Sequence, residues 1–305
     1  MHFADTLVAR MRELGHPLCA GLDPHVDRIP PLFRRGTMEL GDPETAAVVE
    51  EFMLAFVERL VGRVAVVKPQ IAFFEQLGSR GLAALERIVA SARERDLAVL
   101  LDAKRGDIGS TAEGYSRAYL EPNSPCESDA LTLNPYLGLD TLRPFVDRAA
   151  SYGRGLFVLV RTSNPGSADY QERVLEKGGP LYQAVAESLA PLCEELAGPA
   201  TGWSSIGIVA GATYPEQAEK LREILPKALF LVPGYGAQGG SAADAMRGFV
   251  PGPSGREGGI INSSRGLLFP EEARSADTAA GWERAVDGAL DHATDELTRA
   301  VLETD

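Results

Sequence analysis

The sequence contains little cysteine and few histidines. Its 305 residues include three cysteines and four histidines. The cysteines (Cys19, Cys126 and Cys193) are widely separated and odd in number, so they form neither a disulfide framework nor a CxxC metal site. The histidines show no metal-ligand spacing and have no candidate nucleophile nearby. This cysteine usage indicates a reducing, cytoplasmic location.

Long apolar runs and an excess of positive charge are also absent. No run reaches the roughly 18 residues of a membrane-spanning helix, and residues 1–14 are charged and amphipathic, so we expect no secretory signal. The chain has 30 Lys and Arg against 43 Asp and Glu, a net charge of −13. Nucleic acids and anionic membranes require a basic surface, so we expect neither as a partner. A small anionic substrate remains possible, because a local pocket can be positive.

Eight short apolar runs, each ending in a polar or glycine-bearing tip, alternate with segments that suit helices. Continuous apolar runs of this length are typical of strands buried on both faces of a parallel sheet. The predicted strands cover residues 17–23, 64–70, 97–104, 130–135, 155–163, 205–213, 228–236 and 258–266. Apolar residues at helical spacing predict helices over residues 44–62, 81–96, 179–198, 213–225 and within 271–302.

This alternation predicts an α/β fold, a (β/α)8 TIM barrel that forms a single domain over residues 1–305 with extended loops. An open doubly wound sheet is the structural alternative, and it is less favoured because no G-x-G-x-x-G motif follows the first strand. The residues in excess of a typical barrel are expected in loops at 24–43, 121–128, 163–180 and 250–257.

Charged residues lie at the ends of the first three predicted strands, on the face where barrels carry their active sites. They are Asp23, Lys68, Asp102 and Lys104. Asp102 and Lys104 are two residues apart, so on a strand both side chains project to the same face. Lys104 beside carboxylates is expected to stay protonated, which suits a proton donor and not an imine-forming nucleophile. Because burying so many charges without a function is costly, we interpret the set as a functional site.

Glycine-rich turns follow the last predicted strands. The segment PGYGAQGG at 233–240 can bring backbone amides close to an anion, and the segments at 211–216 and 262–266 occupy corresponding places. Arg265 adds a fork of donors that suits two phosphate oxygens. Because the last two strands of these barrels commonly build a phosphate site, the pattern predicts one here.

The segment LLDAKRGDIGST at 100–111 closely resembles the signature of the orotidine 5′-phosphate decarboxylase family. Six further segments occur in the order that the family shows, and the pattern is similar to the longer bacterial branch over essentially the whole chain. They are GLDPH (21–25), VVKPQIAFFE (66–75), RTSNPG (161–166), VAGAT (209–213), PGYGAQGG (233–240) and NSSRG (262–266). The resemblance implies conversion of orotidine 5′-phosphate to uridine 5′-phosphate in de novo pyrimidine synthesis, without metal or organic cofactor.

The resemblance also implies catalytic roles. Lys104 would protonate C6 of the pyrimidine, Asp102 would lie beside the departing carboxylate, and Lys68 would complete an alternating array of charges. Asp107 would reach across a dimer interface into the neighbouring subunit's site, accompanied by Ile108 and Thr111. The protein is therefore expected to be a homodimer whose active sites are shared across the interface.

Further residues match positions that bind substrate in the family. Asp23 would bind ribose hydroxyls, and Ser163 would form a hydrogen bond with the pyrimidine ring. The residues expected at the phosphate are Gly211, Thr213, Gly234, Gly236, Gln238 and Arg265. The polar loop 163–180 is the first candidate for a lid over the site, and the glycine-rich region 233–258 is the second.

Two alternative functions remain open. A Mg²⁺-dependent sugar-phosphate aldolase or decarboxylase of the same superfamily shares the Asp-x-Lys-x-x-Asp segment, although Lys68 would repel a cation placed among the carboxylates. A catalytically silent barrel that only binds nucleotides is the other alternative. It would be expected to lose Lys104 or Asp102 first, and both are present.

Overall fold

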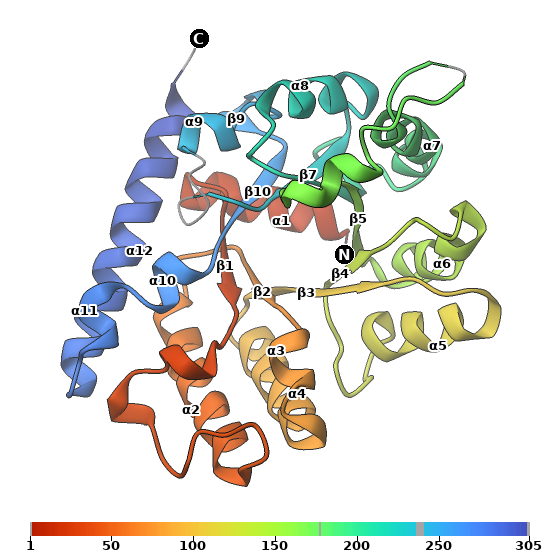
Figure 1. Cartoon of the computed structure of the whole chain (residues 1–305). Coiled ribbons are helices and arrows are strands. Elements are labelled where there is room, and N and C mark those ends of the chain that lie inside the picture. The colour runs from red at the N-terminus through yellow and green to blue at the C-terminus, as the bar shows by residue number, and fades with distance from the viewer. Residues whose placement is uncertain (1, 177, 236–240, 304–305) are drawn as a thin grey trace.

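The computed structural model describes residues 2–176, 178–235 and 241–303. Eight parallel strands close into a barrel in the order β1-β10-β7-β6-β5-β4-β3-β2, and helices surround it (Figure 1). The barrel strands are β1 (Leu18–Leu22), β2 (Val66–Pro69), β3 (Ala98–Arg105), β4 (Ala130–Leu133), β5 (Gly155–Arg161), β6 (Ser204–Ala210), β7 (Ala228–Val232) and β10 (Gly259–Ser263). The predicted (β/α)8 barrel is confirmed, and the open doubly wound sheet is excluded.

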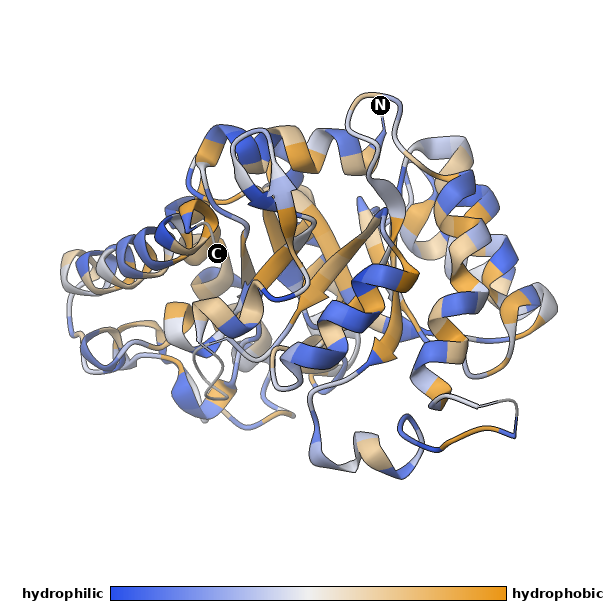
Figure 2. Ribbon diagram, turned by 90° about the horizontal axis from the view of Figure 1, so that it is seen from above, coloured by the Kyte–Doolittle hydropathy of each residue, from blue (hydrophilic) through white to orange (hydrophobic). Residues whose placement is uncertain are grey.

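The strands are apolar on both faces because each face is covered. The inner faces fill the barrel, and the outer faces pack under helices, so β6 and β7 are buried along their whole length. Figure 2 shows mostly apolar residues on the central strands and a mixture of polar and apolar residues on the surrounding helices. Helix α1 (Phe3–Leu14) adds Phe3 and Leu7 to the cluster that fills the barrel. The rings of Phe3 and Phe157 pack edge to face, with their centroids 6.3 Å apart.

The long helices are amphipathic, and two of those named below begin at side-chain caps. Asp42 caps α2 by accepting a hydrogen bond from the backbone N–H of Glu44, and Pro43 occupies the first helical position. These helices are α2 (Pro43–Leu60), α4 (Gly78–Glu94), α5 (Gly109–Leu120), α6 (Arg143–Tyr152), α7 (Leu181–Glu195), α8 (Pro215–Ile224) and α12 (Ala279–Leu302). None of the helices in the described ranges is both long enough and apolar enough to cross a membrane.

Short helices occupy several connections. In the segment 24–43, two 3-10 turns, η1 (Val26–Arg28) and η2 (Pro31–Phe33), follow β1. The others are α3 (Ala72–Glu75), η3 (Leu139–Leu142), η4 (Pro165–Asp169), α9 (Ala242–Ala245), α10 (Arg265–Leu268) and α11 (Glu271–Arg274). The connections after β1, β2, β5, β7 and β10 carry residues that line the mouth of the barrel.

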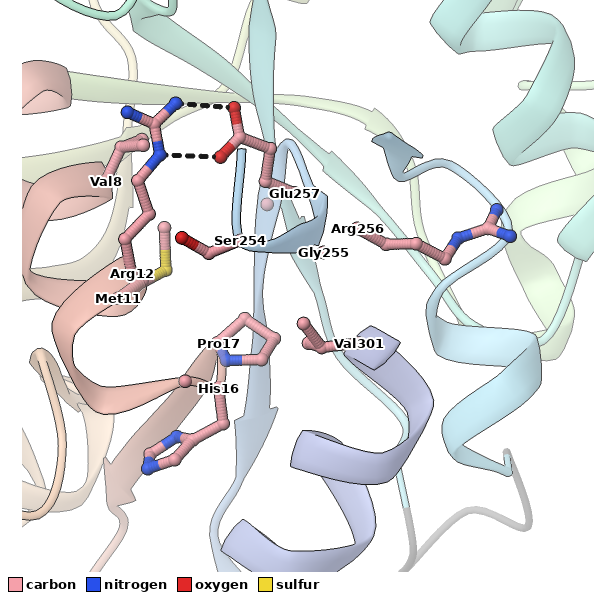
Figure 3. A pocket seen from close by; sticks show the side chains of 12 residues that line it. Val8, Met11, Arg12, His16, Pro17, Ser254, Gly255, Arg256, Glu257 and Val301 are labelled. Atoms are coloured by element: carbon pink, nitrogen blue, oxygen red, sulfur yellow. Dashed lines mark hydrogen bonds and ion pairs between the residues drawn. The ribbon is translucent and has the colours of Figure 1, made fainter. Parts of the chain in front are cut away.

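The segment 250–257, predicted as a loop, is an antiparallel hairpin of β8 (Val250–Gly252) and β9 (Gly255–Glu257). Tertiary contacts explain the difference. Glu257 accepts two hydrogen bonds from the Arg12 guanidinium, both 2.8 Å long, and one from the Trp203 indole. Figure 3 shows the paired Arg12 and Glu257 beside a hollow of about 30 Å³ between α1, the hairpin and the end of α12. This junction fastens the hairpin to α1.

Candidate active site

A cavity of about 490 Å³ opens at the carboxyl ends of the barrel strands. Parallel strands deliver the residues at their tips to this one face, which explains why segments far apart in the sequence meet there. Seven of the predicted site residues line the cavity: Asp23, Lys68, Asp102, Lys104, Ser163, Gly234 and Arg265.

Two lysines and two aspartates alternate along one wall of the cavity. The Lys68 Nζ atom lies 3.1 Å from Asp102 Oδ2 and 3.9 Å from Asp23 Oδ1. The Lys104 Nζ atom lies 2.6 Å from Asp102 Oδ1. The order of charges is therefore Asp23, Lys68, Asp102, Lys104, with each cation beside a carboxylate.

Asp102 is held by four hydrogen-bond donors, two on each oxygen. Lys104 Nζ and the Thr132 hydroxyl donate to Oδ1, at 2.6 and 2.9 Å. Lys68 Nζ and the Gln70 amide donate to Oδ2, at 3.1 and 3.0 Å. Sequence reasoning missed both neutral donors. Gln70 had a usable signal, because it follows Lys68 by two residues at the tip of β2, whereas Thr132 is a single hydroxyl inside the apolar run ALTL.

Burial and charge oppose each other in this cluster, and charge dominates. Lys68 is 4% exposed and Asp102 is 7% exposed. Burial alone would lower the pKa of Lys68, but the charges of Asp102 and Asp23 raise it above the ordinary value. Burial alone would raise the pKa of Asp102, but Lys68 and Lys104 hold it far below the ordinary value. Both groups therefore stay ionised at neutral pH.

The lowered pKa of Asp102 makes stability depend on pH. The carboxyl of an unfolded chain titrates at about 3.9, so in acid the unfolded chain binds more protons than the folded one. The stabilisation from Asp102 is fully present above about pH 4 and is lost as the pH falls toward the folded pKa. In urea titrations between about pH 5 and pH 2, we expect Asp102→Asn to lose less unfolding free energy than the wild type.

A matched control separates this effect from general acid denaturation. Asp277 is exposed and forms no hydrogen bond or ion pair with the described residues, so Asp277→Asn is expected to follow the wild-type curve. At neutral pH Asp102→Asn should itself cost about 3 kcal/mol, because it leaves buried Lys68 without its nearest charge partner. Parallel pH curves for Asp102→Asn and the wild type would contradict the proposed linkage.

One aspartate oxygen in this row of charges has no hydrogen-bond donor among the described residues. Asp23 Oδ1 is buried and has no hydrogen-bond partner among the described residues, and the nearest cation, Lys68 Nζ, is 3.9 Å away. An unpaired buried carboxylate oxygen is costly, so it is a natural acceptor for a ligand hydroxyl. Asn262, another lining residue that sequence reasoning missed, points its amide to the Ser264 hydroxyl at 3.1 Å.

The backbone at Lys104 departs from a regular strand. Its φ is +47°, in the left-handed region, and the pairing of β3 with β4 shifts register between Leu101 and Arg105. The side chains of Asp102 and Lys104 meet as predicted, although the end of β3 that carries them is bulged. The Lys104 N–H donates to the Thr132 hydroxyl at 2.8 Å.

Of the six residues predicted at the phosphate, two line the cavity, two do not, and two fall outside the described residues. Arg265, the first residue of α10, and Gly234, which follows β7, both line the cavity. Gly211 allows the tips of β5 and β6 to approach, because a Cβ there would lie 3.0 Å from that of Ser163. Thr213 is exposed and does not line the cavity. The predictions for Gly236 and Gln238 fall outside the described residues.

The residues predicted to act across a dimer interface do not line their own chain's cavity. Asp107 Oδ1 accepts a hydrogen bond from the adjacent N–H of Ile108, and Ile108 is 62% exposed. Thr111, in the first turn of α5, is also exposed. Tyr136, Leu137 and Leu139, which follow the neighbouring strand β4, are exposed as well, and Tyr136 reaches 84%.

The lid candidate 163–180 is anchored beside the cavity by Arg161, a buried residue at the end of β5 that sequence reasoning missed. Its guanidinium donates hydrogen bonds to Ser167, Gln171 and Glu172 within that segment. It also stacks on the Tyr214 ring, with its central carbon 3.8 Å from the ring centroid. Arg161 therefore connects the segment after β5 to the start of α8.

Comparisons with known proteins cover nearly the whole chain. The family model described as "Orotidine 5'-phosphate decarboxylase / HUMPS family" matches residues 16–279. An orotidine 5′-phosphate decarboxylase of Rhodopirellula baltica is 40% identical over 304 residues, 97% of this chain and 99% of that protein. One from a Nocardioides species is 43% identical over 250 residues, 81% of this chain and 86% of its own length. The solved structure of Leishmania donovani OMP decarboxylase, 31% identical, covers all of both chains with a TM-score of 0.74.

Proposed function

The chain belongs to the orotidine 5′-phosphate decarboxylase / HUMPS family, and from that premise we propose how its residues carry out the reaction. The chain is a carboxy-lyase that converts orotidine 5′-phosphate to uridine 5′-phosphate in pyrimidine biosynthesis. One observation carries the proposed mechanism: the alternating row of Asp23, Lys68, Asp102 and Lys104 at the mouth of the barrel.

Lys104 is the proton donor in this mechanism. When the bond between C6 and the carboxylate breaks, its electron pair remains on C6, where the pyrimidine offers no effective electron sink. An ammonium group fixed at that carbon stabilises the developing charge and then delivers its proton to it. Carbon dioxide leaves, C6 gains hydrogen, and the neutral Lys104 amine regains a proton from water. The reaction requires no metal and no organic cofactor.

Asp102 and Lys68 prepare the electrostatics of the site. Four donors and a lowered pKa keep Asp102 ionised, so its charge repels the substrate carboxylate until carbon dioxide departs. The same charge holds the Lys104 ammonium in place at 2.6 Å. Lys68 bridges Asp102 and Asp23 and so keeps two carboxylates close together at one wall.

The remaining lining residues hold the nucleotide. The unpaired Asp23 Oδ1 accepts a hydrogen bond from a ribose hydroxyl, and Ser163 contacts the pyrimidine ring. Arg265 and the backbone at Gly234 bind the phosphate, which gives binding energy at a distance from the reacting carbon. Gly211 and Thr213, together with Gly236 and Gln238 outside the described residues, are the remaining residues that we propose for the phosphate.

A homodimer with shared sites accounts for Asp107, Ile108 and Thr111. These residues do not line their own cavity, and exposed Ile108, Tyr136 and Leu137 follow the neighbouring strands β3 and β4. Exposed apolar residues near an active site are typical of an interface. In this proposal each subunit is a single barrel domain over residues 1–305. The three buried, unpaired cysteines support a cytoplasmic location, because disulfides are rare in a reducing compartment.

A turnover assay tests this function. Purified protein is expected to release carbon dioxide from orotidine 5′-phosphate in metal-free buffer and to keep its full rate with a chelator. The Mg²⁺-dependent aldolase alternative predicts loss of activity with chelator, and a silent nucleotide-binding barrel predicts binding of uridine 5′-phosphate without turnover. The position of Lys68 disfavours the metal alternative, because its ammonium already lies between Asp102 and Asp23, where a divalent cation would bind.

A further inference from the structure

One hydroxyl connects the backbone of Lys104 to the carboxylate of Asp102. Thr132 lies on β4 with no exposed surface and does not line the cavity. Its Oγ1 accepts a hydrogen bond from the Lys104 backbone N–H at 2.8 Å. The same hydroxyl donates to Asp102 Oδ1 at 2.9 Å. Because a hydroxyl has a single hydrogen, the direction of both bonds is fixed: Thr132 accepts from the Lys104 N–H and donates to the Asp102 carboxylate.

The Lys104 backbone requires support from its surroundings. A φ of +47° is unfavourable for a residue with a Cβ, by about 1–2 kcal/mol. Regular pairing of β3 with β4 stops after Leu101 and resumes where Arg105 pairs with Leu133. Lys104 lies within that interruption, and the Thr132 hydroxyl is the acceptor for its N–H.

The second bond of Thr132 orients the aspartate. Each Asp102 oxygen accepts from one lysine and one neutral donor: Lys104 with Thr132 on Oδ1, and Lys68 with Gln70 on Oδ2. The Thr132 bond thus turns Oδ1 toward Lys104. A single hydroxyl fixes both the main chain that carries the ammonium and the carboxylate that holds it.

We propose that Thr132 is a positioning residue for the decarboxylation, and this inference rests on the proposed roles of Lys104 and Asp102. Its hydroxyl keeps the bulged β3 tip in the conformation that places the Lys104 ammonium at the reacting carbon. Without it, the Lys104 N–H and Asp102 Oδ1 each lose a partner, and the strand tip relaxes. A displacement of about 1 Å at a reacting group costs about 100-fold in rate.

The test compares Thr132→Val, which removes the hydroxyl at nearly constant volume, with Thr132→Ser, which keeps it. We expect Thr132→Val to lower kcat about 100-fold, while the affinity for uridine 5′-phosphate stays at the wild-type value because the product has no carboxylate at C6. Thr132→Ser is expected to retain most of the rate. The matched control is Thr45→Val, which removes an equally buried hydroxyl bonded to the Glu39 carbonyl at 2.7 Å, and wild-type kcat is expected for it.

Three results would overturn the inference. They are wild-type kcat in Thr132→Val, equal losses in Thr132→Val and Thr132→Ser, and a loss of product affinity that matches the loss of kcat. If Thr132→Val does not fold, Thr132→Cys gives the same comparison, because a thiol is only a weak donor and acceptor. Failure of the proposed function is distinguishable, because the wild-type chain itself would then not release carbon dioxide from orotidine 5′-phosphate.

Discussion

Lys104→Ala is expected to lower kcat for decarboxylation of orotidine 5′-phosphate by about 10⁵-fold or more. The substitution removes two contributions at once, because the same ammonium stabilises the negative charge on C6 and supplies the proton. Steady-state kinetics with progress followed by ultraviolet absorbance measures the effect.

The loss in Lys104→Ala should be chemical and not structural. The Lys104 side chain is 45% exposed, so its removal creates no buried cavity, and both the melting temperature and the affinity for uridine 5′-phosphate should stay close to wild type. Lys220→Ala is the matched control, because Lys220 is 49% exposed and pairs with Glu223 away from the cavity. Turnover in Lys104→Ala within about tenfold of wild type is too small a loss for a proton donor and would end this assignment.

Mixing two inactive variants is expected to restore activity. Asp102→Asn disables the site on its own chain, whereas Asp107→Ala disables the site of the partner subunit. In a mixed dimer, one site carries both changes and the other carries neither. Equal amounts of the two chains, allowed to exchange subunits, should therefore recover about a quarter of wild-type activity, since half of the dimers are mixed and each has one intact site.

The control for this experiment pairs two changes that act on the same side of the interface. Asp102→Asn mixed with Lys104→Ala leaves one defect in each site of the mixed dimer, so no recovery is expected. Recovery only in the Asp102→Asn and Asp107→Ala mixture would support a site completed by the partner subunit. If that mixture stays inactive although subunit exchange is demonstrated, the role of Asp107 across the interface is wrong.

The barrel could be predicted because its strands are buried on both faces. Runs such as SIGIVA and ALFLV are continuously apolar, which distinguishes them from the alternating strands of a half-exposed sheet. The charged residues were also predictable, because burying several lysines and aspartates at the ends of apolar strands is costly unless they have a function. The structure brings Asp23, Lys68, Asp102 and Lys104 to one wall, as those positions indicated.

The neutral parts of the site could not be predicted, because their roles depend on contacts between strands. Thr132 matters only because β3 is bulged at Lys104, and nothing in the local sequence of β4 reports a bulge in its neighbour. The hairpin at 250–257 likewise forms through Glu257, whose partners Arg12 and Trp203 are distant in sequence. No helix range was predicted for α5, because Gly109 and Gly114 weaken its helical pattern.

A crystal structure with uridine 5′-phosphate bound tests the central claim most directly, because it locates C6 relative to the array of charges. The proposed mechanism predicts Lys104 Nζ within about 3.2 Å of C6, with Asp102 on the side from which the carboxylate has left. A nucleotide whose C6 faces solvent, or a water or another acid at C6 with Lys104 turned away, would contradict it.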